Sequence, residues 1–203
     1  WTLSRGLGDV YKRQTLNGVE QTVAPLDADT KAYLATATNP FTQQGYPARE
    51  QFEVYPLEKG TILLNKFKTT AKSVDKSPTK TEVRVSMYAD LPDSGAEGTV
   101  YKILNTPIAE DNYYVEYIDG AYQEVIKPDI EYKLDASTLP LGIVQTGAST
   151  WAVGPLTFED KKVGNRKTNP FPSFVGKEIK HVFAYMNRIG FLAGSNVIMS
   201  QPL

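Results

Sequence analysis

Residues 168–200 constrain the fold more than any other part of the chain, because three short apolar runs follow one another there with almost no room between them. The runs are Ile179–Tyr185, Arg188–Ala193 and Asn196–Met199, and two residues separate each run from the next. Two-residue connections join antiparallel neighbours, and Gly194 with Ser195 forms a Gly-X pair typical of a tight hairpin. The segment therefore predicts a compact antiparallel meander, the unit from which propeller blades and sandwiches are built.

Strand and turn signals continue through the rest of the chain. Residues 82–87 alternate apolar and polar side chains, which is the pattern of a half-buried strand. Asp119 and Gly120 separate two strand-like runs and give the strongest short-range hairpin signal in the sequence. Residues 26–37 favour a short helix with Asp27 or Asp29 as its N-cap. We therefore expect a mainly β protein of antiparallel strands and hairpins, with the start of a β-propeller-like blade at its C-terminal end.

Composition excludes several classes of function. The 203 residues include no cysteine, which rules out disulfides, thiolate nucleophiles and cysteine metal sites. No apolar run approaches the ~20 residues that cross a bilayer, so no membrane segment is expected. The 22 basic residues are balanced by 23 acidic ones, which gives no general attraction to nucleic acid.

The residues that could carry catalysis are few. His181 is the only histidine, so a catalytic triad or a histidine-centred metal site would depend on it. It lies beside Lys180 in an alternating predicted strand, which favours a surface or interface role. The acidic pairs at 110–111 and 159–160 are adjacent in sequence, and such neighbours point apart and not across a substrate. We predict that the protein is not an enzyme and has no catalytic residue, metal site or cofactor.

Two other clusters each allow two interpretations. The densest basic segment contains Lys66, Lys68, Lys72, Lys76 and Lys80. It suits phosphate contact in a DNA channel, but a lysine-decorated edge that resists aggregation is the favoured interpretation. An aromatic cluster contains Tyr113, Tyr114, Tyr117 and Tyr122. A platform for a sugar or a base is one interpretation, and packing on both faces of a strand is the favoured one.

A longer pattern of residues resembles a known family. The positions that carry it are Asn169, Pro170, Pro172, Phe174, Gly176, Asn187, Arg188, Gly190, Phe191 and Asn196. An upstream element, Asp111 followed by Tyr113, Tyr114 and Val115, fits the same pattern. Together these motifs resemble the tail tubular protein B family, the nozzle proteins of short-tailed bacteriophage tails.

The resemblance implies a structural virion protein of the phage tail. It implies a homo-oligomeric, hexameric ring that contacts the tail adaptor protein and the tail fibres, with DNA passing through its channel without specific binding. The resemblance places Arg188 where blades must be fixed. A buried guanidinium fork that holds backbone carbonyls at a strand junction is the favoured interpretation there, and an exposed arginine in a turn is the alternative. The alternative is a carbohydrate-binding or carbohydrate-cleaving β-domain of a phage tailspike, which requires paired carboxylates facing an aromatic-lined groove.

The ends of the sequence shape the expected organisation. Residues 4–14, SRGLGDVYKRQ, match the translation of a transposase adapter used to prepare sequencing libraries, so residues 1–14 are expected to be non-native. Residues 15–158 are expected to form an antiparallel β region with a short N-terminal helix, 159–168 a charged linker, and 169–203 an incomplete β-meander. Native sequence is expected to be missing at both ends, and strands beyond Leu203 are expected to complete the meander.

Overall fold

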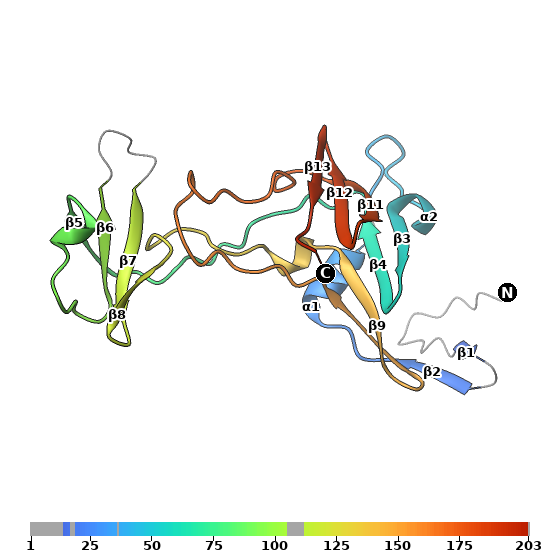
Figure 1. Ribbon diagram of the computed structural model, residues 1–203. Helices are drawn as coiled ribbons and strands as arrows, with labels where there is room; N and C mark the ends of the chain where they lie inside the picture. Colours follow the sequence, from blue (N-terminus) through green and yellow to red (C-terminus); the bar gives the residue numbers. More distant parts are fainter. Residues whose placement is uncertain (1–13, 17–18, 36, 105–111, 203) are drawn as a thin grey trace.

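The computed structural model describes residues 14–16, 19–35, 37–104 and 112–202. Two β units are joined by a long connector (Figure 1). We call the larger unit the body, the unit of residues 81–124 the distal unit, and residues 66–80, 125–140 and 156–178 the connector. The adapter-like residues 4–13 and the acidic pair at 110–111 lie outside the described residues. Strands dominate both units, so the expected mainly β fold is confirmed.

The larger sheet of the body has six strands in the order β1-β2-β10-β9-β4-β3. Its strands are β1 (Gln14–Leu16), β2 (Val19–Val23), β3 (Phe52–Leu57), β4 (Gly60–Asn65), β9 (Leu141–Gly147) and β10 (Thr150–Pro155). All neighbours are antiparallel except β2 and β10, which pair in parallel. An antiparallel hairpin joins β9 to β10.

The smaller sheet of the body is the predicted meander. Its strands β11 (Ile179–Tyr185), β12 (Arg188–Ala193) and β13 (Asn196–Met199) have the bounds that the sequence indicates, and each pairs antiparallel with the next. Met186 and Asn187 form the first turn with φ of 45° and 57°. Two successive left-handed residues give the turn whose twist matches that of the flanking strands, and Gly194, with φ of 60°, begins the second turn.

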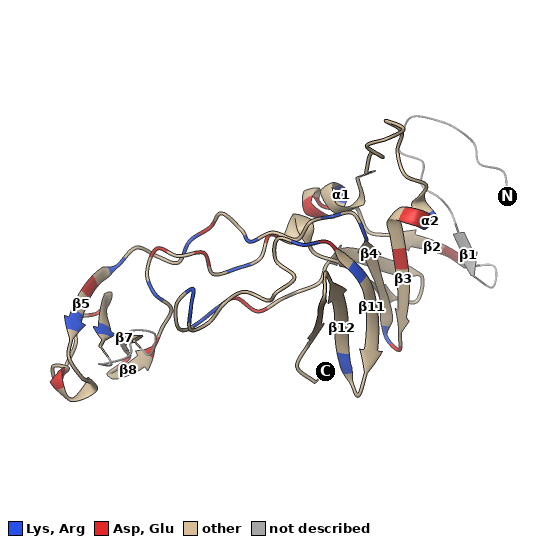
Figure 2. Cartoon of the chain, turned by 90° about the horizontal axis from the view of Figure 1, so that it is seen from above, with Lys and Arg blue, Asp and Glu red and all other residues tan. Residues whose placement is uncertain are grey.

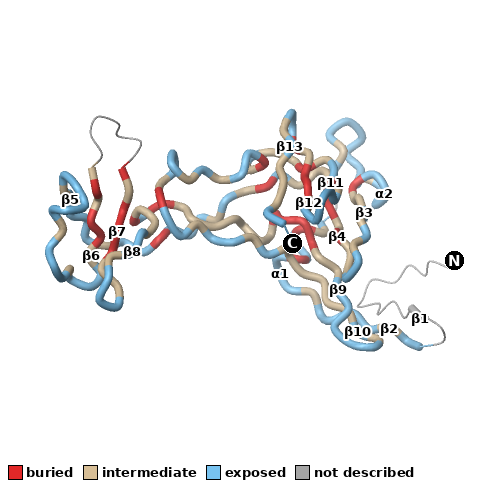
Figure 3. The backbone as a smooth tube through the Cα atoms, viewed as in Figure 1, coloured by how far each residue is buried: buried red, intermediate tan, exposed pale blue. Residues whose placement is uncertain are grey.

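The two sheets of the body enclose one apolar core. The buried side chains that form it are Ile62, Leu64, Phe174, Ile179, Val182, Phe191 and Ala193. Phe174 contacts Phe158 and Phe191 edge to face, with ring centroids 5.8 Å and 6.1 Å apart. Residues far apart in the sequence therefore share one core, and in Figure 3 the buried stretches of β4 and β12 lie close together.

The helix α1 (Ala28–Leu34) is fixed to the edge of this core. It begins at Asp27, whose carboxylate accepts a hydrogen bond from Thr30 N at 2.7 Å, as the sequence predicts. Tyr33 is buried, and its hydroxyl accepts a hydrogen bond from Asn65 N at 2.8 Å. The Asn65 side chain donates to the Tyr33 carbonyl at 2.8 Å. Burial raises the pKa of Tyr33, so its hydroxyl stays neutral beside the end of β4. The other helical segments within the described residues are α2 (Ala48–Gln51), η1 (Tyr88–Asp90) and η3 (Ala136–Thr138).

The distal unit is one four-stranded sheet in the order β5-β6-β7-β8. Its strands are β5 (Thr81–Val85), β6 (Thr99–Ile103), β7 (Tyr113–Ile118) and β8 (Ala121–Glu124). The predicted hairpin at Asp119 and Gly120 is confirmed. The half-buried pattern expected for residues 82–87 is wrong, because β5 is an edge strand whose first four residues are exposed. β5 also pairs in parallel with β6, and such a pair needs a long connection.

Candidate functional site

The connector consists of three stretches of chain that run side by side between the two units (Figure 2). Prolines such as Pro78, Pro128 and Pro170 supply no backbone N–H group, which prevents a regular ladder of strands. Isolated bridges, such as Lys72 with Leu134 and Ile126 with Gly164, and single backbone hydrogen bonds join the stretches. Side chains therefore have to supply much of the attachment.

Ion pairs supply part of it. Figure 2 shows basic and acidic positions alternating along the connector. The pairs are Lys72 with Glu131 (3.2 Å), Lys76 with Asp129 (3.0 Å), Lys133 with Asp75 (2.7 Å) and Lys80 with Glu116. We call this set the ion-pair ladder. Three of the five lysines in the basic segment thus face carboxylates, a role that neither sequence interpretation included. The partners of Lys72 and Lys76 lie on the returning stretch, and the partner of Lys80 lies on β7 of the distal unit.

Glu131 is the centre of the ladder. One of its carboxylate oxygens accepts from Arg166 Nε at 3.0 Å and Arg166 Nη2 at 2.7 Å, and the other contacts Lys72 Nζ at 3.2 Å. These interactions, with Arg166 contributing most, lower the pKa of Glu131 to about 2. The carboxylate therefore stays ionised at neutral pH and links all three stretches of the connector.

Ser77 joins the chain that enters the distal unit to the chain that leaves it. It is buried, and its hydroxyl donates to Lys127 O at 2.7 Å and accepts from Ile130 N at 3.1 Å. Its backbone N–H donates to Ile130 O at 2.8 Å, and its carbonyl accepts from Asp129 N at 3.3 Å. One short side chain thus binds two backbone groups of the opposite stretch, of which the Ile130 N–H is buried.

The family-pattern residues of the body mostly have packing roles. Phe174 and Phe191 lie in the core. A Cβ atom at Gly190 would lie 2.3 Å from the Phe183 ring, so no larger residue fits there without movement. Gly176 has φ of +83°, a conformation that strains other residues. The Asn169 side chain donates to Val163 O at 3.1 Å.

The other members of the pattern lie at turns and at the surface. Asn187 occupies the β11–β12 turn, Asn196 pairs across from Ala193, and Pro170 and Pro172 line a groove described below. The expected buried fork at Arg188 is wrong. Arg188 is exposed at the start of β12, and its Nη1 donates to one carbonyl, that of Ser200, at 3.2 Å.

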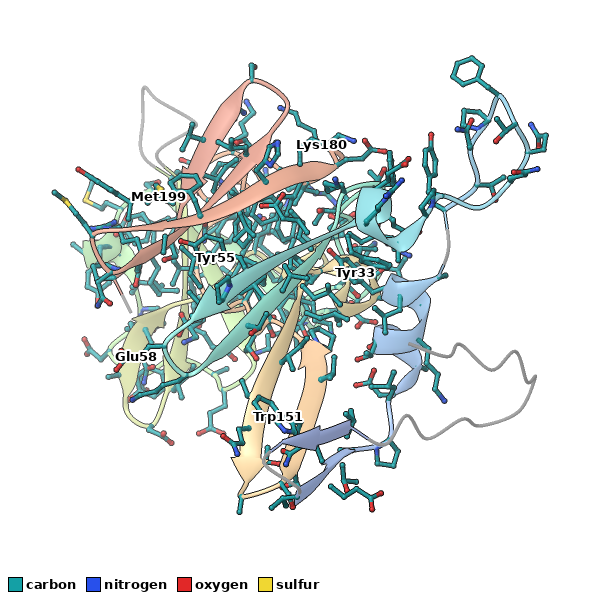
Figure 4. The ribbon with its side chains drawn as sticks, turned by 90° about the vertical axis from the view of Figure 1, so that its right-hand side faces the viewer. Tyr33, Tyr55, Glu58, Trp151, Lys180 and Met199 are labelled. Carbon is teal, nitrogen blue, oxygen red and sulfur yellow. The ribbon has the colours of Figure 1, made fainter. Side chains whose placement is uncertain are left out.

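His181 lies on β11, at one edge of the smaller sheet. Its Nδ1 lies 2.9 Å from Glu53 Oε2, and Glu53 Oε1 accepts from Val182 N at 3.4 Å. Tyr55, which lies on β3 in Figure 4, accepts from Ala184 N at 3.0 Å. The outward backbone groups of β11 are thereby bound by β3 side chains. Sequence reasoning missed Glu53 and Tyr55, although alternate residues of one strand share a face.

The opposite edge of this sheet is open. Register places Ala193 opposite Asn196 across a two-residue turn, so the backbone groups of Val197 and Met199 point away from β12. The Val197 side chain is 63% exposed. The smaller sheet thus presents one covered edge and, at β13, one edge that no described strand pairs.

A groove of about 690 Å³ lies beside β13. Leu134, Phe158 and Ile198 supply apolar lining, and Glu159 and Asp160 stand among the charged residues around it. Phe171 also lines it, and Lys161 Nζ lies 3.5 Å from the centre of that ring. Burial is the main cause that lowers the pKa of Lys161. Glu159 is exposed and lies 3.7 Å from Lys162 Nζ.

The tyrosine cluster of the distal unit packs against itself. Tyr122 meets Tyr88, Tyr101 and Tyr117 edge to face, with ring centroids 5.1 to 6.3 Å apart. Its hydroxyl donates to Pro92 O at 2.8 Å. Tyr114 lies buried on the other face of the sheet, which fits the favoured packing interpretation.

Within the described residues, no three His, Cys, Asp or Glu side chains come together where they could hold a metal ion. In the same part of the chain, no helix is long and apolar enough to span a membrane.

The fold is therefore that of a mainly β protein in which the side chains of the family pattern and of the connector stabilise strands or lie at the surface. The chain belongs to the bacteriophage nozzle protein family, whose model matches residues 10–202. It is also similar to the tail tubular protein gp12 of Escherichia phage T7, with 32% identity over 117 residues. That match covers 56% of this chain and 15% of the relative, so the chain corresponds to a small part of that protein's length. Membership in this family makes the protein a structural virion component of the phage tail.

Proposed function

We propose that the protein forms part of the wall of a tail nozzle, in a closed hexameric ring around the channel through which DNA leaves the phage. The family match carries this proposal. The structure supports it through a body with a single apolar core and a braced connector, features suited to a load-bearing wall.

The proposed partners are further copies of the chain, the tail adaptor protein and the tail fibres. DNA would pass through the channel without specific binding. The ion-pair ladder supports that part of the proposal, because Lys72, Lys76 and Lys80 are held by carboxylates. A net charge of −1 likewise gives no general attraction to phosphate.

For the organisation of the chain, we propose that residues 169–203 begin a unit which further strands complete. The open edge at β13 supports this proposal, since the outward backbone groups of Val197 and Met199 could receive another strand. The exposed Val197 side chain would be covered by the same addition.

A tailspike role is the second candidate, and one observation favours it. Glu159 and Asp160 stand at a groove that is also lined by Phe158 and Phe171. A carbohydrate-cleaving site requires two carboxylates on either side of the substrate, and both of these line the groove although they are adjacent in sequence. The observation is weakened because Lys161 covers the Phe171 ring and Lys162 lies near Glu159.

One experiment separates the two roles. The gene would be deleted from its phage and restored as wild type or as the double variant Glu159→Gln, Asp160→Asn. Tails would be scored by electron microscopy, DNA ejection by release of encapsidated genomes, and hydrolysis of host surface polysaccharide by reducing ends. The nozzle role requires that deletion abolish tails and that the double variant restore both tails and ejection. Normal tails combined with lost polysaccharide cleavage would support the tailspike role instead.

A further inference from the structure

One loop of the body projects away from both sheets. It joins α1 to α2 and appears as the light-blue loop at the upper right of Figure 4. Thr38 and Gly45 form a bridge across its base, and Phe41, near its tip, is 92% exposed. We call residues 38–45 the finger. A solvent-exposed aromatic side chain can contribute much of the binding energy when it enters a pocket of a partner.

Hydrogen bonds fix the shape of the finger. The Asn39 carboxamide oxygen accepts from Phe41 N at 2.9 Å and Thr42 N at 3.3 Å. The Asn39 carbonyl accepts from Gln43 N at 2.9 Å, and Asn39 N donates to Gln44 O at 2.8 Å. At its base Tyr46 stacks on Phe67, with ring centroids 4.2 Å apart. A loop ordered before it binds loses little conformational entropy on binding, so its shape favours tight contact.

The groove beside β13 has a size and an apolar lining that suit the Phe41 side chain. The groove beside β13 has apolar lining from Leu134, Phe158 and Ile198, and its volume of about 690 Å³ exceeds the space that one side chain needs. Its charged residues at 159–162 are two acidic and two basic, so their charges sum to zero. The finger has no charged residue between positions 38 and 45. The summed charges therefore give no net electrostatic repulsion between the two surfaces.

The finger and the groove cannot meet within one molecule. The finger lies beside α2 and β3, whereas the groove lies beside β13, on the opposite flank of the body (Figure 1). A protruding group on one flank and a complementary hollow on the other produce head-to-tail contacts between copies, which close into a ring when the rotation allows.

We propose that the finger of one copy inserts Phe41 into the groove of a neighbouring copy. The inference rests on the proposed self-assembly and names the contact that would carry it. It assigns the groove to a second copy of this chain and makes Phe41 the main anchor of the junction.

The test uses the whole 203-residue chain in sedimentation velocity over a range of concentrations. Phe41→Ser removes the anchor, and Gln201→Trp fills the groove from an exposed position on its lining. Each variant alone should associate at least about tenfold more weakly than wild type. Mixed together they should form pairs that grow no further, because the first keeps an intact groove and the second an intact finger. Val74→Ser is the matched control, since Val74 is also 92% exposed but lies on the connector, and it should associate like wild type.

Several results would overturn the inference. They are a wild-type chain that stays monomeric at every concentration, a Phe41→Ser chain that associates normally, and a mixture that forms no pairs. Binding of a bacterial surface oligosaccharide that Gln201→Trp blocks and Phe41→Ser leaves unchanged would assign the groove to the tailspike role. A phage that carries Phe41→Ser and assembles normal tails would reject the finger contact while leaving the nozzle role standing.

Discussion

The body and the distal unit are both small, mainly antiparallel β assemblies, yet they are stabilised differently. The body joins two sheets over seven buried apolar side chains contributed by β4, β11, β12 and Phe174. The distal unit has one sheet, and its core cluster contains three buried residues, Tyr101, Ile103 and Val115. Ion pairs and Ser77 tie it to the body through the connector.

The two units thus depend on different forces: the body on burial of apolar side chains, and the attachment of the distal unit largely on ion pairs. Burial of apolar area is not weakened by salt, whereas ion pairs between partly exposed groups are screened and contribute little one at a time. We therefore expect the body to unfold as one cooperative unit. The distal unit should open more easily, with a stability that responds to salt and pH.

The largest effect is expected for Leu64→Ala in the body. Leu64 is fully buried, so the cavity left by this change should lower the free energy of unfolding by about 2–5 kcal/mol. Urea unfolding followed by Trp151 fluorescence, in a background with Trp1→Phe, measures it. Ile103→Ala in the distal unit should leave that transition nearly unchanged while increasing hydrogen exchange in β6. Equal losses in both variants would show that the two units unfold together.

Ser77→Ala should have the next largest effect. It leaves the buried Ile130 N–H and the partly buried Lys127 carbonyl without their side-chain partner, at a cost of about 1–3 kcal/mol. Hydrogen exchange at the Ile130 amide should accelerate accordingly, while amides of β4 should not change. Ser73→Ala is the control, because the hydrogen bonds of the Ser73 hydroxyl go to Asp75, two residues along the same stretch, and not to the opposite stretch. Faster exchange in β4 as well would mean that the connector supports the body.

Glu131→Gln should loosen the connector without unfolding the body. Removing the charge releases Arg166 and Lys72, so small-angle X-ray scattering should show a wider range of distances between the units. Wild type should approach this state in high salt. Because the folded pKa is about 2, below the ordinary 4.5, the stabilisation is complete above about pH 4.5 and is lost as pH falls towards 2. Glu159→Gln is the control, and an unchanged scattering profile for Glu131→Gln would contradict the role of the ladder.

Arg188→Ala should have the smallest effect. Its guanidinium is exposed and bonds to one carbonyl, so the change in unfolding free energy should stay within about 0.5 kcal/mol. Chemical unfolding measures it, and Arg84→Ala on the exposed strand β5 supplies the comparison. A loss above about 2 kcal/mol would restore the idea of a structural fork, as expected for buried hydrogen bonds to a charged group.

The parts of the fold that sequence predicts well depend on neighbours along the chain. The bounds of β11, β12 and β13 and the hairpin at Asp119 follow from alternation and turn chemistry, which act over a few residues. The parallel pairing of β5 with β6 was not predicted, because nothing local specifies it.

Contacts between residues far apart in the sequence could not be predicted either. Lys76 and Asp129 are 53 positions apart, and Glu53 and His181 are 128 apart, so no spacing rule joins them. The family pattern indicated that Arg188 is important but gave no burial, and the position of Arg188 at a hairpin end leaves it in solvent. The finger had no signal beyond a phenylalanine between turn-forming residues.

The four hydrogen bonds at Ser77 also bear on how such a protein can evolve. They hold the start and the end of the distal unit side by side, so residues 81–124 leave the connector and return to it at one place. A segment whose ends are adjacent can be exchanged for another of different length without moving the strands outside it. Recombination between phages could therefore replace the distal unit as a whole. Its surface could then diversify while the connector and the body stay the same.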